Sequence, residues 1–515
     1  MIAALVALAL LLAFFILRHE IWTRVFLTAV DPRPAGLLRV AFGGVVLWTF
    51  LCLAPSVRLF FSDEGLLLPA MARDASRSPL RQLWDPVHGF EHWWSPLQAL
   101  LGSSSILQLR SDPPLTFAVY GLALVSAALM TLGVWTTVTT AATWFLGEQL
   151  YRYDAMFTNG GDLVIRAFLF LAIFCRWGEA YSVDAWRRRR RELLGGASGI
   201  PPLCAIPAWP LRLMMVQLAL IYFLNGWHKT GEGWREGSAL YYALNLDHFY
   251  RFPAQGVVAS LQQLGVLPLA TWITRGWELC FPLALLGAAL RGYEADRRAG
   301  TWPTAGSARR IASWLLLAAA GAAAAAILEP LPALATGGAA LVLLLLYRTA
   351  RARFPGVVRF VLDWVLGKRI WLVFGLALHL GIDLGMNIGT FPQVMMAVYL
   401  AWLSAPEIEA LWRVVLRRAT PVTVRYHPDE ASVRQAALLR LREHGPIEFV
   451  ADSTVEPRSL HVDSPARSDG LRGAEAALAL VPVFPALWWL RPFRRLAPLR
   501  GPAGRLALRR LGSKA

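Results

Sequence analysis

The feature that most constrains the fold is a series of apolar segments, each long enough or nearly long enough to cross a lipid bilayer. A crossing helix needs about 20 mostly apolar residues, because the hydrocarbon core of a bilayer is ~30 Å thick. Of the 515 residues, 56% are hydrophobic, which is too apolar for an ordinary soluble protein of this length. We therefore predict an all-α polytopic membrane bundle with about 11 transmembrane helices. The predicted crossings are Met1–Leu17, Leu37–Ala54, Leu115–Trp135, Thr136–Leu150, Leu163–Trp177, Pro207–Asn225, Leu267–Leu290, Ile311–Leu328, Leu331–Tyr347, Ile370–Met386 and Phe391–Leu403.

The net charge of +17 comes almost entirely from arginines between the apolar segments. This pattern is typical of cytoplasmic loops under the positive-inside rule and does not favour a nucleic-acid surface. Arg187 to Arg191 form a run that would be costly to translocate, so we place this loop in the cytoplasm. The alternation of crossings then puts the N terminus outside and the C terminus inside. A bacterial cytoplasmic membrane, with membrane lipids as partners, fits this pattern.

The sequence changes character after Pro406 and predicts a small α/β domain. Val422–Tyr426 alternates like a strand, and Ala431–His444 has the spacing of an amphipathic helix. Ile447–Val450 and Ser459–Asp463 are the next expected strands, and an alanine-rich helix follows from Gly473. We assign residues 420–515 to this domain and place it in the cytoplasm.

The stretch Tyr222–Tyr242, YFLNGWHKTGEGWREGSALYY, joins polar and aromatic residues to the end of an apolar run. Lys229 lies just past that run. A partly desolvated lysine loses the hydration of its ammonium group, so it can act as a base. Alternatively, Lys229 reaches the lipid headgroups, as lysines at helix ends commonly do.

Other polar groups have simpler interpretations. The four cysteines have unrelated spacings, which favours neither a disulfide framework nor a zinc site. His88 and His92 are spaced i, i+4 without an evident third ligand, so an interfacial loop is favoured over a metal site. Arg275 and Glu278 lie one helical turn apart and predict an ion pair. We predict no metal.

Six motifs, in this order along the chain, resemble the HTTM family, the membrane domain shared with vitamin K-dependent γ-glutamyl carboxylase. The resemblance assigns residues 22–405 to an HTTM-like domain. Residues 1–20, an additional transmembrane helix, and the hairpin 311–347 look like insertions. The motifs are DPRPAGLLRVAFG (Asp31–Gly43), FFSDEGLLLP (Phe60–Pro69), YSVD (Tyr181–Asp184), Tyr222–Tyr242, RGWELCFPL (Arg275–Leu283) and HLGIDLGMNIGTFP (His379–Pro392).

In the carboxylase, a lysine after an apolar helix and a glycine deprotonates reduced vitamin K. Matching its G-x-x-K-x-x-x-x-W-x-x-G pattern here aligns Lys229 with that base. The resemblance thus implies a reduced quinone of the vitamin K or menaquinone type, carbon dioxide addition and a protein substrate at the outer face. We assign catalysis to Lys229 and His228. The residues assigned to cofactor binding are Trp227, Trp234, His379, Asn159 and Asp162.

The sequence departs from the carboxylase in two respects. Gly161 stands where the carboxylase has a functional histidine, and the large lumenal domain that grips the substrate's propeptide has no counterpart. His379 has an alternative interpretation as a hydrogen-bonded contact between helices.

The C-terminal segment resembles the DCC-type thiol oxidoreductases, which are thioredoxin-like. In that family the first strand runs into Asp-x-x-Cys-x-x-Cys, but here HPDEASVRQ follows the strand, with no cysteine after Cys280. Thiol–disulfide exchange needs a thiolate nucleophile, so we predict a degenerate, redox-inactive domain.

Two functions remain open. The first is a quinone-dependent, carboxylase-like enzyme, and the second is a scaffold or assembly subunit of a membrane complex. Lys229 favours the enzyme, whereas the missing cysteines and histidine favour the scaffold.

Overall fold

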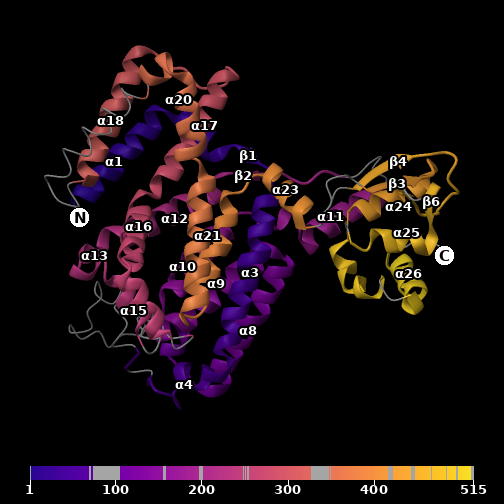
Figure 1. Ribbon diagram of the computed structural model, residues 1–515, viewed down its shortest axis with the longest axis horizontal. Coiled ribbons are helices and arrows are strands. Elements are labelled where there is room, and N and C mark those ends of the chain that lie inside the picture. The colour runs from indigo at the N-terminus through magenta and orange to yellow at the C-terminus, as the bar shows by residue number, and fades with distance from the viewer. Residues whose placement is uncertain are drawn as a thin grey trace, which may run out of the picture.

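The computed structural model describes residues 2–68, 71–72, 105–154, 158–195, 201–246, 249, 251, 254–325, 347, 349–415, 422–441, 447–464, 467–482, 484–494 and 497–511. Most of these residues are helical, and the strands are short. Figure 1 shows a long helical body joined to a smaller α/β unit at the C-terminal end. His88, His92 and the predicted crossing Leu331–Tyr347, apart from Tyr347, lie outside the described residues.

The helical body is a bundle of long helices with short connections. α3 is surrounded by α8, α22 and the short helix before α11. The main helices of the body are α3 (Arg33–Leu53), α4 (Val57–Phe61), α8 (Pro113–Leu132), α9 (Thr136–Tyr153), α10 (Gly160–Ile173), α12 (Trp209–His228), α16 (Val266–Cys280), α17 (Pro282–Arg298), α21 (Lys368–Gly385) and α22 (Phe391–Val398).

The centre of the bundle is an apolar stripe on α3 in which every fourth residue is buried. Leu38, Phe42, Val46 and Phe50 are each at most 1% exposed. This spacing places them on one face of the helix, where they pack against neighbouring helices. The Phe42 ring lies 6.2 Å from the ring of Phe168 in α10.

Arg39 is fully buried on α3 and binds backbone carbonyls. Its Nη1 donates to Met130 O at 3.1 Å and Thr131 O at 2.9 Å, at the end of α8. Its Nη2 donates to Tyr181 O at 2.5 Å. Met130 O also accepts from Gly133 N at 3.0 Å in the turn that ends α8, so the guanidinium adds a cation at this helix end and joins three segments.

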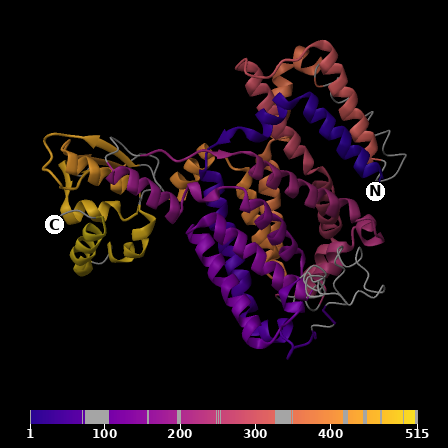
Figure 2. The same ribbon diagram turned by 180° about the vertical axis from the view of Figure 1, so that it is seen from behind.

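Two helices form a separate pair at one side of the body. α1 (Ile2–Leu17) packs along α18 (Ser307–Ala325), away from α3 and α8 (Figures 1 and 2). An ionic network holds the end of α1, since Glu20 binds Arg18 at 2.6 Å and Arg309 at 3.2 Å. The chain then bends by 91° between Leu5–Leu17 and His19–Leu27.

The C-terminal unit is a mixed four-stranded sheet with helices. The strand order is β4-β3-β5-β6, with β3 parallel to β4 and the other neighbours antiparallel. α24 connects β3 to β4, and α25 follows β6 and packs against α26. The elements are β3 (Val422–Tyr426), α24 (Glu430–Arg440), β4 (Ile447–Ala451), β5 (His461–Ser464), β6 (Arg467–Arg472), α25 (Gly473–Leu480) and α26 (Ala497–Leu511).

α11 (Val183–Leu194), which carries the five consecutive arginines, contacts this unit. Leu193 of α11 is buried with Ala437 and Leu441 of the α24 region. Apolar side chains near the ends of α11 and α24 thus connect the helical body to the C-terminal unit.

The predicted helical class is confirmed, but the number of crossings is not. Three helices of the described chain are long and apolar enough to cross a membrane, or up to five if each bent pair forms one span. The apolar segment predicted over Leu267–Leu290 is divided into α16 and α17 near Pro282, because proline favours a helix start. Helical structure extends beyond the predicted crossing Leu37–Ala54, since α3 continues through a 3₁₀ turn (Ala54–Ser56) into α4.

Candidate functional site

The close approach of α12 and α16 is set by a glycine. A Cβ at Gly226 would lie 2.8 Å from Leu279 N and 3.0 Å from Glu278 Cβ, so a larger residue would push the helices apart. Lys229 is the first residue after α12, with φ −78° and ψ 63°. Its side chain therefore leaves the helix end beside Glu278.

Lys229 and Glu278 form an ion pair at this helix contact. The Lys229 ammonium donates to Glu278 Oε2 and lies 4.7 Å from the centre of the Trp234 ring. The Glu278 side chain is 9% exposed and that of Lys229 is 22% exposed. A charge pair so far removed from water depends on both partners, because either charge alone would be poorly solvated.

A chain of neutral polar groups lies next to this pair. Tyr222, seven residues before Lys229, shares a hydrogen bond of 2.7 Å with His379 Nε2 of α21. The Tyr222 hydroxyl also hydrogen-bonds the hydroxyl of Tyr399 in η8 (Tyr399–Trp402). The imidazole is 2% exposed, so the predicted helix–helix contact of His379 is present.

Aromatic rings enclose this hydrogen-bonded chain. The Tyr222 ring lies 4.7 Å from Trp277 and 4.6 Å from Phe281, both on the α16 side. Two buried nitrogens here, His379 Nδ1 and Trp277 Nε1, have no hydrogen-bond partner in the described structure. An indole N–H donates and an imidazole nitrogen donates or accepts, so both nitrogens keep hydrogen-bonding capacity toward an oxygen atom, and the surrounding rings offer flat apolar surfaces.

Asn159 and Asp162 form a capping box at the start of α10. Asn159 Oδ1 accepts from Gly161 N at 2.7 Å, and Asp162 Oδ2 accepts from Asn159 N at 2.9 Å. Both side chains thus bind the helix terminus and have a structural role. Both residues lie near the group formed by Lys229, Glu278, Tyr222, His379 and Tyr399, which we call the Lys229 cluster. A Cβ at Gly161 would be 3.0 Å from Phe391 Cα, and the Phe391 ring packs 5.6 Å from His379.

Of the three other residues predicted for the site, one contacts Lys229 and two lie away from it. Trp234 joins the cluster through its ring contact with Lys229. Trp227 stacks on Phe223 at 5.9 Å, on a different face of α12 from Tyr222. His228 is exposed, so the structure does not bring it into the cluster.

The predicted ion pair between Arg275 and Glu278 is wrong, because Glu278 binds Lys229 instead. Arg275 Nε is buried without a hydrogen-bond partner in the described structure. Sequence reasoning also missed Tyr222 and Tyr399. The seven-residue spacing of Tyr222 and Lys229, two helical turns, is the signal that could have identified Tyr222.

The second candidate site lies between β3 and α24, where the DCC-type family has its cysteines. Asp429 caps α24 by accepting from Ser432 N at 3.2 Å, and it contacts His427 Nδ1 at 3.0 Å. Nearby, hydrogen bonds from Thr454 and then from Arg425 lower the pKa of Asp452 to about 2. The loop thus holds a helix cap and a contact between Asp429 and His427, and the ionic contacts of Asp452 lie beside it, after β4.

No family model matches the chain, and neither a curated protein nor a solved structure matches it.

Proposed function

We propose that the chain is an integral membrane protein of the carboxylase-like HTTM family, with eleven crossings and a bacterial inner-membrane location. Its outer site uses Lys229 as a base on a reduced quinone. The observation that carries this proposal is the convergence of Tyr222 and Lys229 of the α12 region with Glu278 of α16, His379 of α21 and Tyr399 of η8. A buried cluster of proton-exchanging groups is costly unless it is fully paired or functional.

The residues suited to hold the quinone are the aromatic side chains around Tyr222 and the unpaired nitrogens of His379 and Trp277. A bound hydroquinone would supply an acidic hydroxyl and, with oxygen, the strong base that carbon dioxide addition to a glutamate side chain requires. The remaining chemistry belongs to the chain's own residues.

Glu278 is the positioning residue for Lys229. The carboxylate accepts from the ammonium at rest, so it also fixes where the nitrogen lies. Before Lys229 can take a proton it must lose one, and Glu278 is the acceptor in hydrogen-bond contact. Transfer within the pair neutralises both groups, which a water-poor site favours more than water does.

The Tyr222 hydroxyl joins two further proton-exchanging groups beside the Lys229–Glu278 pair. A hydroxyl both donates and accepts, so Tyr222 can pass a proton between His379 and Tyr399. Both partners are buried, which keeps this exchange away from bulk water.

The decisive variant is Lys229→Arg, which keeps the positive charge but cannot act as a base at accessible pH. We expect normal insertion, and loss of hydroquinone- and oxygen-dependent incorporation of labelled carbon dioxide by ~100-fold or more. Arg235→Lys is the control, because Arg235 is an exposed cation of the same stretch. If wild type lacks this activity with every quinone tested and Lys229→Arg complements a deletion fully, the enzyme proposal is wrong.

A scaffold is the second candidate, and the contact between α11 and α24 favours it. The degenerate thioredoxin-like domain is held against the arginine-rich helix by Leu193, Ala437 and Leu441. Along the chain, this domain has a β-α-β unit followed by a β-hairpin and a helix, and its sheet order is β4-β3-β5-β6. Both are the arrangement expected of a thioredoxin-like domain. Without cysteines, such a domain retains a surface for a partner of a membrane complex.

Orientation is tested by single cysteines in a variant lacking the native cysteines. Arg189→Cys and Ser468→Cys are expected to resist a membrane-impermeant thiol reagent in intact cells, whereas Glu232→Cys reacts. Glu232 is exposed just after Lys229. Labelling of the first two positions from outside would contradict the proposed topology.

A further inference from the structure

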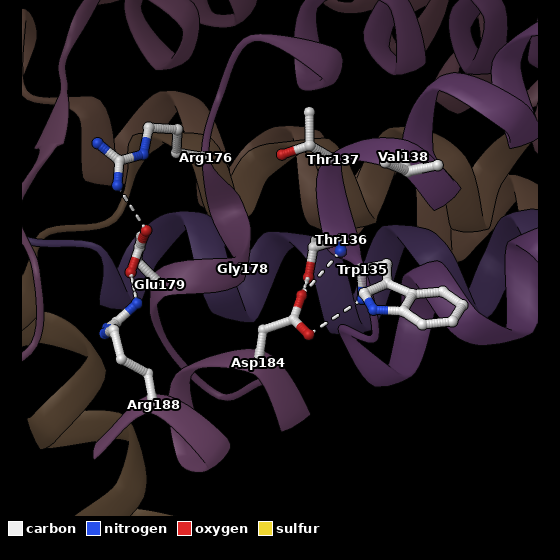
Figure 3. Close-up of a pocket in the computed structure, with 9 residues that line it drawn as sticks. All are labelled: Trp135, Thr136, Thr137, Val138, Arg176, Gly178, Glu179, Asp184 and Arg188. Carbon is white, nitrogen blue, oxygen red and sulfur yellow. Dashed lines mark hydrogen bonds and ion pairs between the residues drawn. The ribbon is translucent and has the colours of Figure 1, made fainter. Parts of the chain in front are cut away.

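A cavity of about 280 Å³ opens between the turn joining α8 to α9 and the start of α11 (Figure 3). The arginine pattern places this end of the bundle at the cytoplasmic face. The residues that matter to the inference are Trp135, Val138, Arg176, Glu179, Asp184 and Arg188, all of which line the cavity.

The Asp184 carboxylate forms one side of the cavity and is already hydrogen-bonded to the chain itself. Asp184 accepts from the backbone nitrogens of Trp135 at 3.0 Å and Thr136 at 2.8 Å. It also accepts from the Thr136 hydroxyl at 2.7 Å. Asp184 thus fastens the turn to α11, and its negative charge is spread over three donors.

The opposite side carries two guanidinium groups that share one carboxylate. Glu179 binds Arg176 at 2.7 Å and also binds Arg188, as Figure 3 shows. These three groups carry one net positive charge, while Asp184 on the other wall and Glu192, 3.9 Å from Arg188 Nε, carry negative charges that other donors or water stabilise. Arg188 Nη2 is buried without a hydrogen-bond partner in the described structure, and Arg176 is 57% exposed with further free donor capacity.

The rim of the cavity is apolar and faces away from the bundle. Trp135 is 70% exposed and Val138 is 67% exposed. Leu132, at the end of α8, is 59% exposed, and α8 is one of the helices long and apolar enough to cross a membrane. Tryptophan is enriched at the headgroup level of membranes, where its ring meets both hydrocarbon and water.

We propose that this cavity binds the phosphate group of an acidic phospholipid of the cytoplasmic leaflet. Arg188 and Arg176 bind the phosphate oxygens, since guanidinium groups form strong, directional bonds to phosphate. Trp135 and Val138 contact the glycerol and upper acyl chain. The remaining arginines of α11 raise the local concentration of anionic lipid but do not define the site.

The test measures binding of fluorescent phosphatidylglycerol to the purified full-length chain in detergent. Arg188→Gln and Arg176→Gln are each expected to weaken binding about tenfold or more, because each removes a charge-assisted hydrogen bond. Arg187→Gln is the matched control: Arg187 is exposed, belongs to the same run and does not line the cavity. We expect it to change binding less than twofold, within the range of a screened surface charge.

Two further measurements separate a lipid from free phosphate. Trp135→Ala is expected to weaken binding of the lipid, and millimolar inorganic phosphate is expected to leave the lipid bound to the wild-type chain. Arg176→Gln keeps the test valid if Arg188→Gln fails to fold, since Arg176 is half-exposed. Equal losses in Arg187→Gln and Arg188→Gln, equal binding of phosphatidylcholine, or displacement by millimolar inorganic phosphate would each overturn the proposal.

Discussion

The Lys229 cluster and the loop before α24 differ in how their polar groups are used. In the cluster, buried groups from different helices contact one another, and within the described part of the chain His379 Nδ1 and Trp277 Nε1 have no hydrogen-bond partner. In the loop, Asp429 caps its helix, and just after the neighbouring strand β4 Asp452 binds Thr454 and Arg425. Unused hydrogen-bonding capacity at a buried site is costly and suggests a role beyond stability. The comparison therefore supports the proposed site around Lys229 over one in the loop before α24.

The largest expected loss of stability comes from breaking the ion pair between Lys229 and Glu278. Lys229→Met leaves the Glu278 carboxylate buried without its partner, and we expect the free energy of unfolding to fall by about 3 kcal/mol. Denaturation in detergent measures this loss. Lys229→Arg, which keeps the pair, is expected to lose less than about 1 kcal/mol, and Lys229→Met with Glu278→Gln is expected to recover most of the loss. A loss below about 1 kcal/mol for Lys229→Met alone would mean that the pair is solvated.

The next effect concerns the position where the carboxylase has a histidine. Gly161→His places its Cβ 3.0 Å from Phe391 Cα, and we expect a loss of about 2 kcal/mol from overpacking. Gly160→Ala is the control, since its Cβ would lie 3.8 Å from the Phe391 ring, an ordinary contact. Thermal unfolding compares the two variants. A stable Gly161→His protein with enhanced quinone-dependent activity would show that the histidine is tolerated here.

A smaller effect measures the hydrogen-bonded chain. Tyr222→Phe removes the hydroxyl that binds both His379 and Tyr399, and we expect a loss of about 1–2 kcal/mol. Tyr399→Phe removes one of these bonds and is expected to lose about half as much. Unfolding by denaturant quantifies both. Equal losses would indicate that Tyr222 is not the shared partner.

The smallest effect is the pH dependence of the stability that Asp452 gives to the C-terminal domain. Because the folded pKa of Asp452 is about 2, its contribution to stability is fully present above the unfolded pKa of ~3.9. That contribution is lost as the pH falls from ~3.9 to 2, where both states become protonated. We expect Asp452→Asn to be less stable than wild type at pH 6 and to approach it near pH 2. A constant difference across this range would contradict the assignment.

The sequence by itself determined the helical class, the strand β3 and the helix beginning at Gly473. Apolar runs and alternation are local patterns, so burial and backbone hydrogen bonding fix the element type. The weaker patterns failed: β6 and α26 were missed, because Arg467–Arg472 lacks strand alternation and α26 contains Pro502. The motif around Lys229 drew attention to Lys229, but it did not indicate which residues contact it.

Only the tertiary structure decided those partners. Glu278 lies one helical turn from Arg275, yet it binds Lys229 because Gly226 lets α12 approach α16 closely. Tyr222 meets His379 and Tyr399 through helix packing across more than 150 residues of sequence. His228 and Trp227 adjoin Lys229 in sequence but face elsewhere, since successive helical residues point about 100° apart. Local sequence defines which groups are present, and the distances between helices define which of them meet.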